Sequence, residues 1–158
     1  MQDPLSLTSV AKFHQTFNHP ILEQPTIPDP KRCSLRVALL REELQELQEG
    51  IQNGDIVEIA DALCDLQYVL SGAILEFGLA EKFKALFDEV QRSNMSKACQ
   101  SLEEAEATIQ HFQSQGVACH YVQQGNLYLI YRTEDNKTLK SIAYSPANLS
   151  AILEEAVK

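Results

Sequence analysis

Apolar residues recur at helical spacing through the first two thirds of the chain. The first such segment, 5–17, places four side chains on one face, Val10, Phe13, His14 and Phe17. The segment "NHPILEQPTIPDPKR" follows it, and its four prolines predict an ordered linker without helix.

Three further helices are predicted before residue 97. The second covers 30–49, with Pro30 in its first turn and Asp29 as its N-cap. The third runs from a cap at Asp55 to about residue 77, and the fourth covers about 81–92. The third is apolar almost all round, a pattern typical of a buried helix.

The pattern changes after residue 97. Ser101 and Glu104 form a capping-box signal for a helix that ends near Gly116. The segment "VACHYVQQGNLYLIYRTEDNKTLKSIAYSP" then alternates apolar and polar residues, which predicts a small antiparallel sheet of two or three strands. We therefore expect a mainly α fold, in which a four-helix core (1–97) and a small α+β appendage (98–158) form one compact domain.

Charge and composition narrow the classes of partner. The 158 residues are 44% hydrophobic and carry a formal net charge of −9, which disfavours binding to nucleic acid or to an anionic membrane surface. No apolar run approaches the roughly 18 residues of a membrane span, and the four cysteines lack CxxC spacing. We expect a cytoplasmic protein that binds neither nucleic acid nor membranes.

Acidic residues gather on the second and third predicted helices. No Lys or Arg occurs between Glu42 and Glu81. Burying unpaired carboxylates costs several kcal/mol each, so they must be protonated, paired or bound to a cation. Two antiparallel helices with carboxylates at i and i+3 can form an oxygen-lined cage, which suits Mg²⁺, or Mn²⁺ in its place. The acids of both helices are Glu42, Glu43, Glu46, Glu49, Glu58, Asp61 and Asp65.

These acids allow two other interpretations. The acids of the second helix alone would form an exposed, solvated face. A di-iron bundle would need Glu-x-x-His on its helices, but all four histidines lie outside this region. The three acids on the apolar third helix favour the Mg²⁺ cage.

These residues also resemble a known family. Glu43-x-x-Glu46 followed by Glu58-x-x-Asp61 is similar to the ExxE…ExxD signature of the all-α, MazG-like nucleoside triphosphate pyrophosphohydrolases. The segments "EIADALCDLQYVLSG" and "FDEVQRSNMSK" look like the branch named after phosphoribosyl-ATP pyrophosphohydrolase. The resemblance covers roughly 35–97, and the stretch from 98 to about 138 looks like an insertion.

The resemblance implies Mg²⁺-dependent hydrolysis of a nucleotide between its α and β phosphates. It assigns metal binding to the four signature acids and catalysis to Glu42 and Glu43, where Glu42 binds a further ion or orients the attacking water. It also implies a homodimer or homotetramer. The metal ligands are Glu43, Glu46, Glu58 and Asp61, and the substrate-binding residues are Asp65, Tyr68, Asn94 and Lys97.

The sequence lacks a GxxxxGK[ST] loop. The phosphates of a nucleotide must therefore be held by metal ions and a few side chains. Five basic residues are candidates, and the simpler interpretation for all except Lys97 is an ordinary surface base. They are Arg36, Arg41, Arg92, Lys97 and Lys140.

Three functions compete at this point. The first is the nucleotide pyrophosphohydrolase. The second is a non-catalytic regulator that binds nucleotide and Mg²⁺ in the same cage, with the β-rich appendage as its interaction module. The third is a structural helical oligomer without a ligand. Retention of all four signature acids favours the first over the third.

Overall fold

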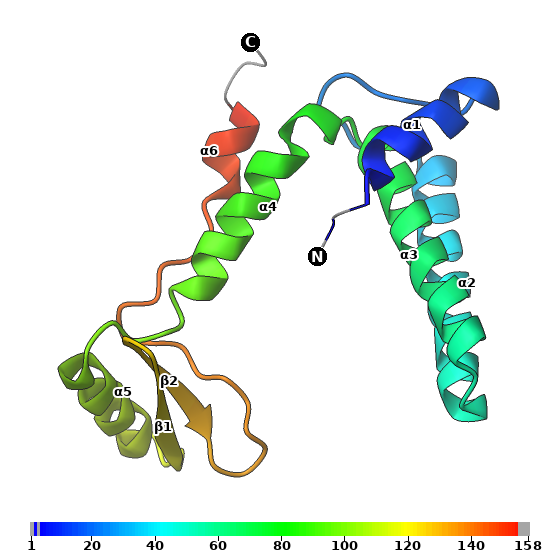
Figure 1. Cartoon of the computed structure of the whole chain (residues 1–158). Helices are drawn as coiled ribbons and strands as arrows, with labels where there is room; N and C mark the ends of the chain where they lie inside the picture. Colours follow the sequence, from blue (N-terminus) through cyan, green and yellow to red (C-terminus); the bar gives the residue numbers. More distant parts are fainter. Residues whose placement is uncertain (1, 3, 155–158) are drawn as a thin grey trace. The chain divides into compact units, whose positions relative to one another are not determined.

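The computed structural model describes residues 2 and 4–154 (Figure 1). These residues form helices and one small antiparallel sheet, so the fold is mainly α with a small α+β appendage, as the sequence predicts. The chain divides into two compact units, Met1–Lys84 and Ala85–Ala156. This division falls inside helix α4 (Ala80–Met95).

The first unit contains α1 (Ser6–Thr16), α2 (Pro30–Asn53) and α3 (Ile56–Glu76). Asp29 caps α2 by accepting from two backbone N–H groups, and Asp55 caps α3 in the same way. Helices α2 and α3 lie side by side as a hairpin, and α1 packs against α3 (Figure 1). Both predicted N-caps are confirmed.

The predicted end of the second helix at residue 49, just before Gly50, is wrong. Helix α2 continues to Asn53, and Gly54 takes the left-handed conformation at its end, with φ +67°. Gly50 is instead buried inside the helix, where a Cβ would lie 3.1 Å from the backbone nitrogen of Ile59. It is a site of close helix approach.

The two helices keep a constant antiparallel register. Near the turn, a Cβ on Gly50 would lie 3.3 Å from the Cβ of Glu58. At the other end, Arg32 of α2 pairs with Glu76 of α3. The steps from 50 to 32 and from 58 to 76 each span 18 residues, so side chains between these ends lie at matching heights.

A buried ionic cluster joins the far ends of α2 and α3. Glu76 is only 1% exposed and accepts hydrogen bonds from Arg36 and from both Nε and Nη2 of Arg32. Burial alone would raise the pKa of Glu76, but the bonds from Arg36 and Arg32 outweigh it and hold this pKa below its ordinary value. The cluster is therefore charged at neutral pH.

The proline-containing linker is tied to the end of α3. Leu22 N donates to Leu75 O and Thr26 N to Phe77 O, each at 3.0 Å. Gly78 follows α3 with φ +66°, and a Cβ there would lie 1.9 Å from Gln24 O. The predicted end of the third helix at about residue 77 is confirmed. The left-handed conformation and the close approach of the linker both require glycine at residue 78.

The expectation that the third helix is buried is wrong for the single chain. Ile56 and Val57 are more than 70% exposed, and Leu63 and Leu70 are 51% and 42% exposed. Helix α2 also has an apolar stripe that is more than half exposed, at Val37, Leu44 and Ile51.

The second unit packs α5 (Leu102–Ser114) on the hairpin of β1 (Cys119–Gln124) and β2 (Leu127–Arg132). Ser101 accepts from Glu104 N, and Glu104 accepts from Gln100 N, so Ser101 caps the helix as predicted. The core of this unit is Cys99, Ala105 and Ile130. A short helix, α6 (Leu149–Glu154), follows.

No single helix among residues 2 and 4–154 is long and apolar enough to cross a membrane. Helices α3 and α4 meet such criteria of length and composition only as a bent pair.

Glu76→Gln should destabilise the fold by about 3–5 kcal/mol, because it leaves two arginines without their buried anion. Urea unfolding measures this difference, with Glu23→Gln as an exposed control. The pKa of Glu76 is lowered from 4.5, so its stabilisation is complete above that value and is lost as pH falls through the folded-state pKa. The gap between wild type and variant should therefore narrow progressively as pH falls below 4.5. A constant gap from pH 7 to pH 3 would contradict the ionic role.

Candidate functional site

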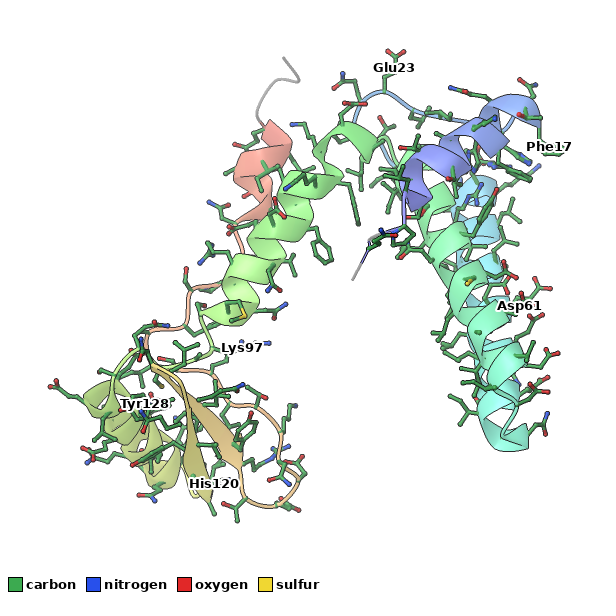
Figure 2. The ribbon with its side chains drawn as sticks, in the orientation of Figure 1. Phe17, Glu23, Asp61, Lys97, His120 and Tyr128 are labelled. Carbon is green, nitrogen blue, oxygen red and sulfur yellow. The ribbon has the colours of Figure 1, made fainter. Side chains whose placement is uncertain are left out.

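Carboxylates from both members of the hairpin meet in its middle. Helix α2 supplies Glu42, Glu43 and Glu46, and the register places Glu43 level with Asp65 of α3. Figure 2 marks Asp61, one turn earlier on α3. Glu58 lies nearer the turn, beside Gly50.

Glu43 lies close enough to other acids of the hairpin for their charges to affect it. The pKa of Glu43 is raised, first by its partial burial and then by the charges of its neighbours. These neighbours come from both helices, and they are Glu46, Asp65, Glu42 and Asp61. The structure therefore gathers five of the acids that the sequence selects.

These acids lack basic partners. In the part of the chain that the structure describes, the side chains of Glu42, Glu43, Glu46, Glu58, Asp61 and Asp65 form no hydrogen bond or ion pair. All except Glu43 are exposed. The expectation that the α3 acids are buried is therefore wrong for the single chain, so burial does not force them to bind a cation.

The acids are not arranged as a finished metal site. Within 2 and 4–154, no group of three or more His, Cys, Asp or Glu side chains lies as it would around a metal ion. The donor chemistry nevertheless fits Mg²⁺, because all donors are carboxylate oxygens, they come from two facing helices, and their own charge is uncompensated. Assembly of the site would require side-chain rotation around an ion.

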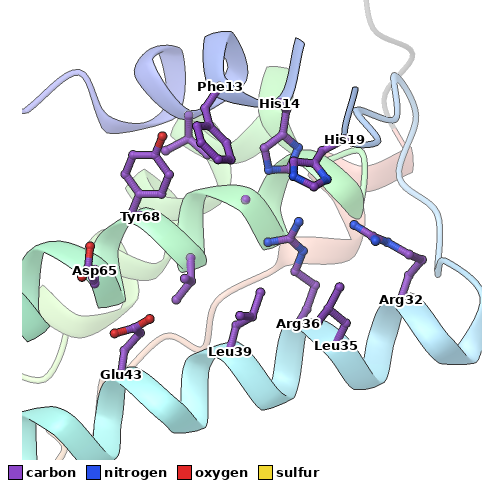
Figure 3. A pocket seen from close by; sticks show the side chains of 13 residues that line it. Phe13, His14, His19, Arg32, Leu35, Arg36, Leu39, Glu43, Asp65 and Tyr68 are labelled. Carbon is purple, nitrogen blue, oxygen red and sulfur yellow. The ribbon is translucent and has the colours of Figure 1, made fainter. Parts of the chain in front are cut away.

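A pocket of about 320 Å³ extends from these acids between α1, α2 and α3 (Figure 3). Glu43 and Asp65 lie at one end of it. Arg36 and His14 lie toward the other end. The remaining lining is Val10, Phe13, His19, Arg32, Leu35, Leu39, Tyr68, Val69 and Gly72.

Aromatic rings line the middle of this pocket. Phe13 of α1 meets Tyr68 of α3 edge to face, with centroids 5.6 Å apart, and stacks on His19 at 5.8 Å. The structure thus places Asp65 and Tyr68, both predicted to bind substrate, in one pocket with Glu43.

His14 has a defined protonation state. Its Nδ1 lies 2.9 Å from Pro20 O, and because a carbonyl oxygen only accepts, Nδ1 carries the proton. The pKa of His14 is lowered, mainly by burial, so the ring is neutral at pH 7. Its Nε2 is then a hydrogen-bond acceptor.

Sequence reasoning missed the burial of the basic end of the pocket. Arg36 is 8% exposed, so the interpretation of Arg36 as an ordinary surface base is wrong. The available signal was Glu76, a lone acid in the apolar run "SGAILEFGLA". Such an acid needs a buried base, and the spacing along an antiparallel partner helix points to residues 32 and 36.

Asn94 and Lys97 belong to the second unit. There Lys97 Nζ donates to Asn94 Oδ1 at 2.8 Å at the end of α4, where Figure 2 marks Lys97. The neighbouring serines hold the following chain: Ser93 bonds the Tyr144 hydroxyl, and Ser96 accepts from Ser145 N. The segment "SNMSK" therefore has a structural role in this unit.

Comparison with known proteins identifies a family. The family model for phosphoribosyl-ATP pyrophosphohydrolase matches residues 10–94, which is more than half of the chain. An uncharacterized protein, L479, of Acanthamoeba polyphaga mimivirus is 25% identical over 237 aligned positions, covering 92% of this chain and 94% of the viral protein. The alignment is longer than this chain, so the viral protein carries inserted residues.

Glu43→Gln should raise the melting temperature slightly in the absence of divalent cations. The substitution removes repulsion with Glu46 and Asp65, and a like-charge pair one helical turn apart costs roughly 0.2–0.5 kcal/mol. Differential scanning fluorimetry in EDTA measures the change. Because salt screens repulsion, the gain should shrink between low and 0.5 M NaCl; a fall in melting temperature at low salt would contradict the proximity of these charges.

Proposed function

We propose that this chain, which belongs to the phosphoribosyl-ATP pyrophosphohydrolase family, hydrolyses a nucleoside triphosphate or a related nucleotide between its α and β phosphates. The products are a nucleoside monophosphate and pyrophosphate, and the reaction needs Mg²⁺, which Mn²⁺ can replace. The observation that carries the proposal is the unpaired acidic face of α2 and α3, which opens into a pocket of nucleoside size.

Glu43, Glu46, Glu58 and Asp61 are the proposed metal ligands. When held there, Mg²⁺ would neutralise phosphate oxygens and lower the pKa of bound water. Without it, the acidic face would repel a triphosphate, because none of its carboxylates pairs with a base among the described residues. This repulsion explains why we expect no turnover in EDTA.

The chain supplies the catalytic carboxylates and the substrate contacts. We assign catalysis to Glu43 and Glu42, and Glu43 would act through the ion that it helps to hold. We assign to Glu42, on the adjacent exposed position, the orientation of the attacking water or the binding of a further ion. Asp65 and Tyr68 contact the nucleoside in the pocket.

A nucleotide panel tests the reaction. Wild-type protein with Mg²⁺ should release pyrophosphate, detected as phosphate only after inorganic pyrophosphatase is added, together with the matching monophosphate. Asp61→Asn should lower kcat/KM at least about 100-fold, since it weakens the proposed ion site. Glu49→Gln, which neutralises an acid on the same hairpin outside the site, is the matched control.

Three results would count against the proposal. Full activity in EDTA or in Asp61→Asn would exclude the carboxylate site. Release of phosphate without pyrophosphatase would indicate another cleavage position. Tight nucleotide binding without any product would favour the regulator instead.

We also propose a homodimer or homotetramer formed through the helical unit. The apolar stripe of α2, including Leu44 and Ile51, is 57–60% exposed at these residues, and a contiguous stripe of this kind marks an interaction surface. Antiparallel pairing of two such hairpins would also cover the apolar side of α3.

Light scattering tests the assembly. Wild type should give at least twice the 17.7 kDa chain mass, and Leu44→Glu should shift it toward the single-chain mass because a charge cannot enter an apolar interface. Leu102→Glu, an exposed leucine on α5, should leave the mass unchanged. A wild-type mass of about 18 kDa at micromolar concentration would refute the assembly.

A further inference from the structure

We propose that Arg36 and His14 recognise the nucleobase of the substrate, and that they select bases with a carbonyl group next to a ring N–H. This inference rests on the proposed function and names its substrate class: uracil, thymine, guanine or hypoxanthine nucleotides. It places the base at the end of the pocket away from Glu43 and Asp65, with the phosphates at those acids.

Arg36 has unused hydrogen-bond donors. It is 8% exposed, and among residues 2 and 4–154 its one hydrogen bond, from Nη2, goes to Glu76, which also serves Arg32. Within the same residues the Nε of Arg36 is buried and has no hydrogen-bond partner. Two guanidinium groups share one carboxylate, so the cluster keeps a net positive charge. A buried cation in this state binds an additional acceptor oxygen strongly.

His14 supplies the matching acceptor. Its protonated Nδ1 is held by Pro20 O, so its unprotonated Nε2 is free to accept. A Cβ on Gly72 would lie 3.1 Å from this Nε2 and 2.7 Å from Arg36 Nη1. The donor and the acceptor therefore approach the same small area of α3, where only glycine leaves both in place.

A ligand that carries a hydrogen-bond acceptor next to a hydrogen-bond donor would complement Arg36 and His14. In uracil or guanine the carbonyl oxygen would accept from Arg36 while the adjacent ring N–H donates to His14. In cytosine or adenine at the same position, an amino group would face the guanidinium and a ring nitrogen would face Nε2, so donor meets donor and acceptor meets acceptor.

The walls of the pocket favour a flat neutral ring over a second phosphate. Phe13 and Tyr68 present an edge-to-face aromatic pair, and Leu35, Leu39 and Val69 add apolar surface. A phosphate would leave its charged oxygens against these groups, which is costly, whereas a nucleobase covers them and exposes only its polar edge to Arg36 and His14.

Matched nucleotide pairs test the recognition. Deoxyuridine triphosphate against deoxycytidine triphosphate, and deoxyinosine triphosphate against deoxyadenosine triphosphate, differ only at this edge. We expect kcat/KM to favour the carbonyl member of each pair by roughly 10- to 100-fold, the range of a hydrogen bond to a charged group. In Arg36→Met the preference should fall to about threefold or less.

Two further variants separate recognition from charge and folding. Arg36→Met leaves Glu76 paired with Arg32, so the fold should persist. Arg32→Met removes the same charge from the cluster but should keep the base preference. Gly72→Ala keeps both arginines and should lower the preference, because its methyl group displaces Arg36 Nη1.

The outcomes distinguish this inference from the proposed function. Hydrolysis with equal rates for both members of each pair, or with an amino-base preference, would overturn the inference and leave the function standing. If no nucleotide is hydrolysed, binding of the α,β-methylene analogues by calorimetry decides: equal affinities within each pair overturn the inference, and an affinity ratio that Arg36→Met abolishes supports it.

Discussion

The buried cluster of Glu76 with Arg32 and Arg36 fixes the relation between α2 and α3 on which the candidate site depends. It holds one end of the hairpin, while the close approach at Gly50 and the left-handed Gly54 hold the other. Between these ends a shift of one residue would turn side chains by about 100°. The register therefore decides that acids of both helices meet, rather than pointing to different sides.

The same cluster has a second consequence for the pocket. Breaking a buried ion pair is costly, so Arg36 is held in a single place, and this place is the wall opposite the acidic end. The pocket therefore has negative charge at one end, positive charge at the other and aromatic rings between. A nucleotide with its phosphates drawn to metal ions and its base drawn to Arg36 satisfies all three regions.

Local signals in the sequence predicted much of the fold. Asp29, Asp55 and Ser101 cap helices as expected because a cap depends only on neighbouring backbone groups. The predicted end of α2 before Gly50 was wrong because a glycine that allows close helix contact looks the same in the sequence as a glycine that ends a helix. The acids of the site were recognised by their spacing. The burial of Arg36 was not predicted, because it depends on Glu76, 40 residues away. The exposure of α3 was not predicted either, because an apolar pattern does not reveal which faces of a helix the rest of the chain covers.

We propose that the carboxylates of α2 and α3 bind divalent cations and that these ions make the pocket competent for a nucleotide. Electron paramagnetic resonance of Mn²⁺ measures this binding directly, since the signal of the free aqueous ion is lost when the ion binds. We expect wild type to bind Mn²⁺. An α,β-methylene nucleotide should tighten this binding because the two ligands share the acidic face, and Asp61→Asn should weaken it at least tenfold. Equal Mn²⁺ affinity in wild type and Asp61→Asn, with no effect of the nucleotide, would contradict it.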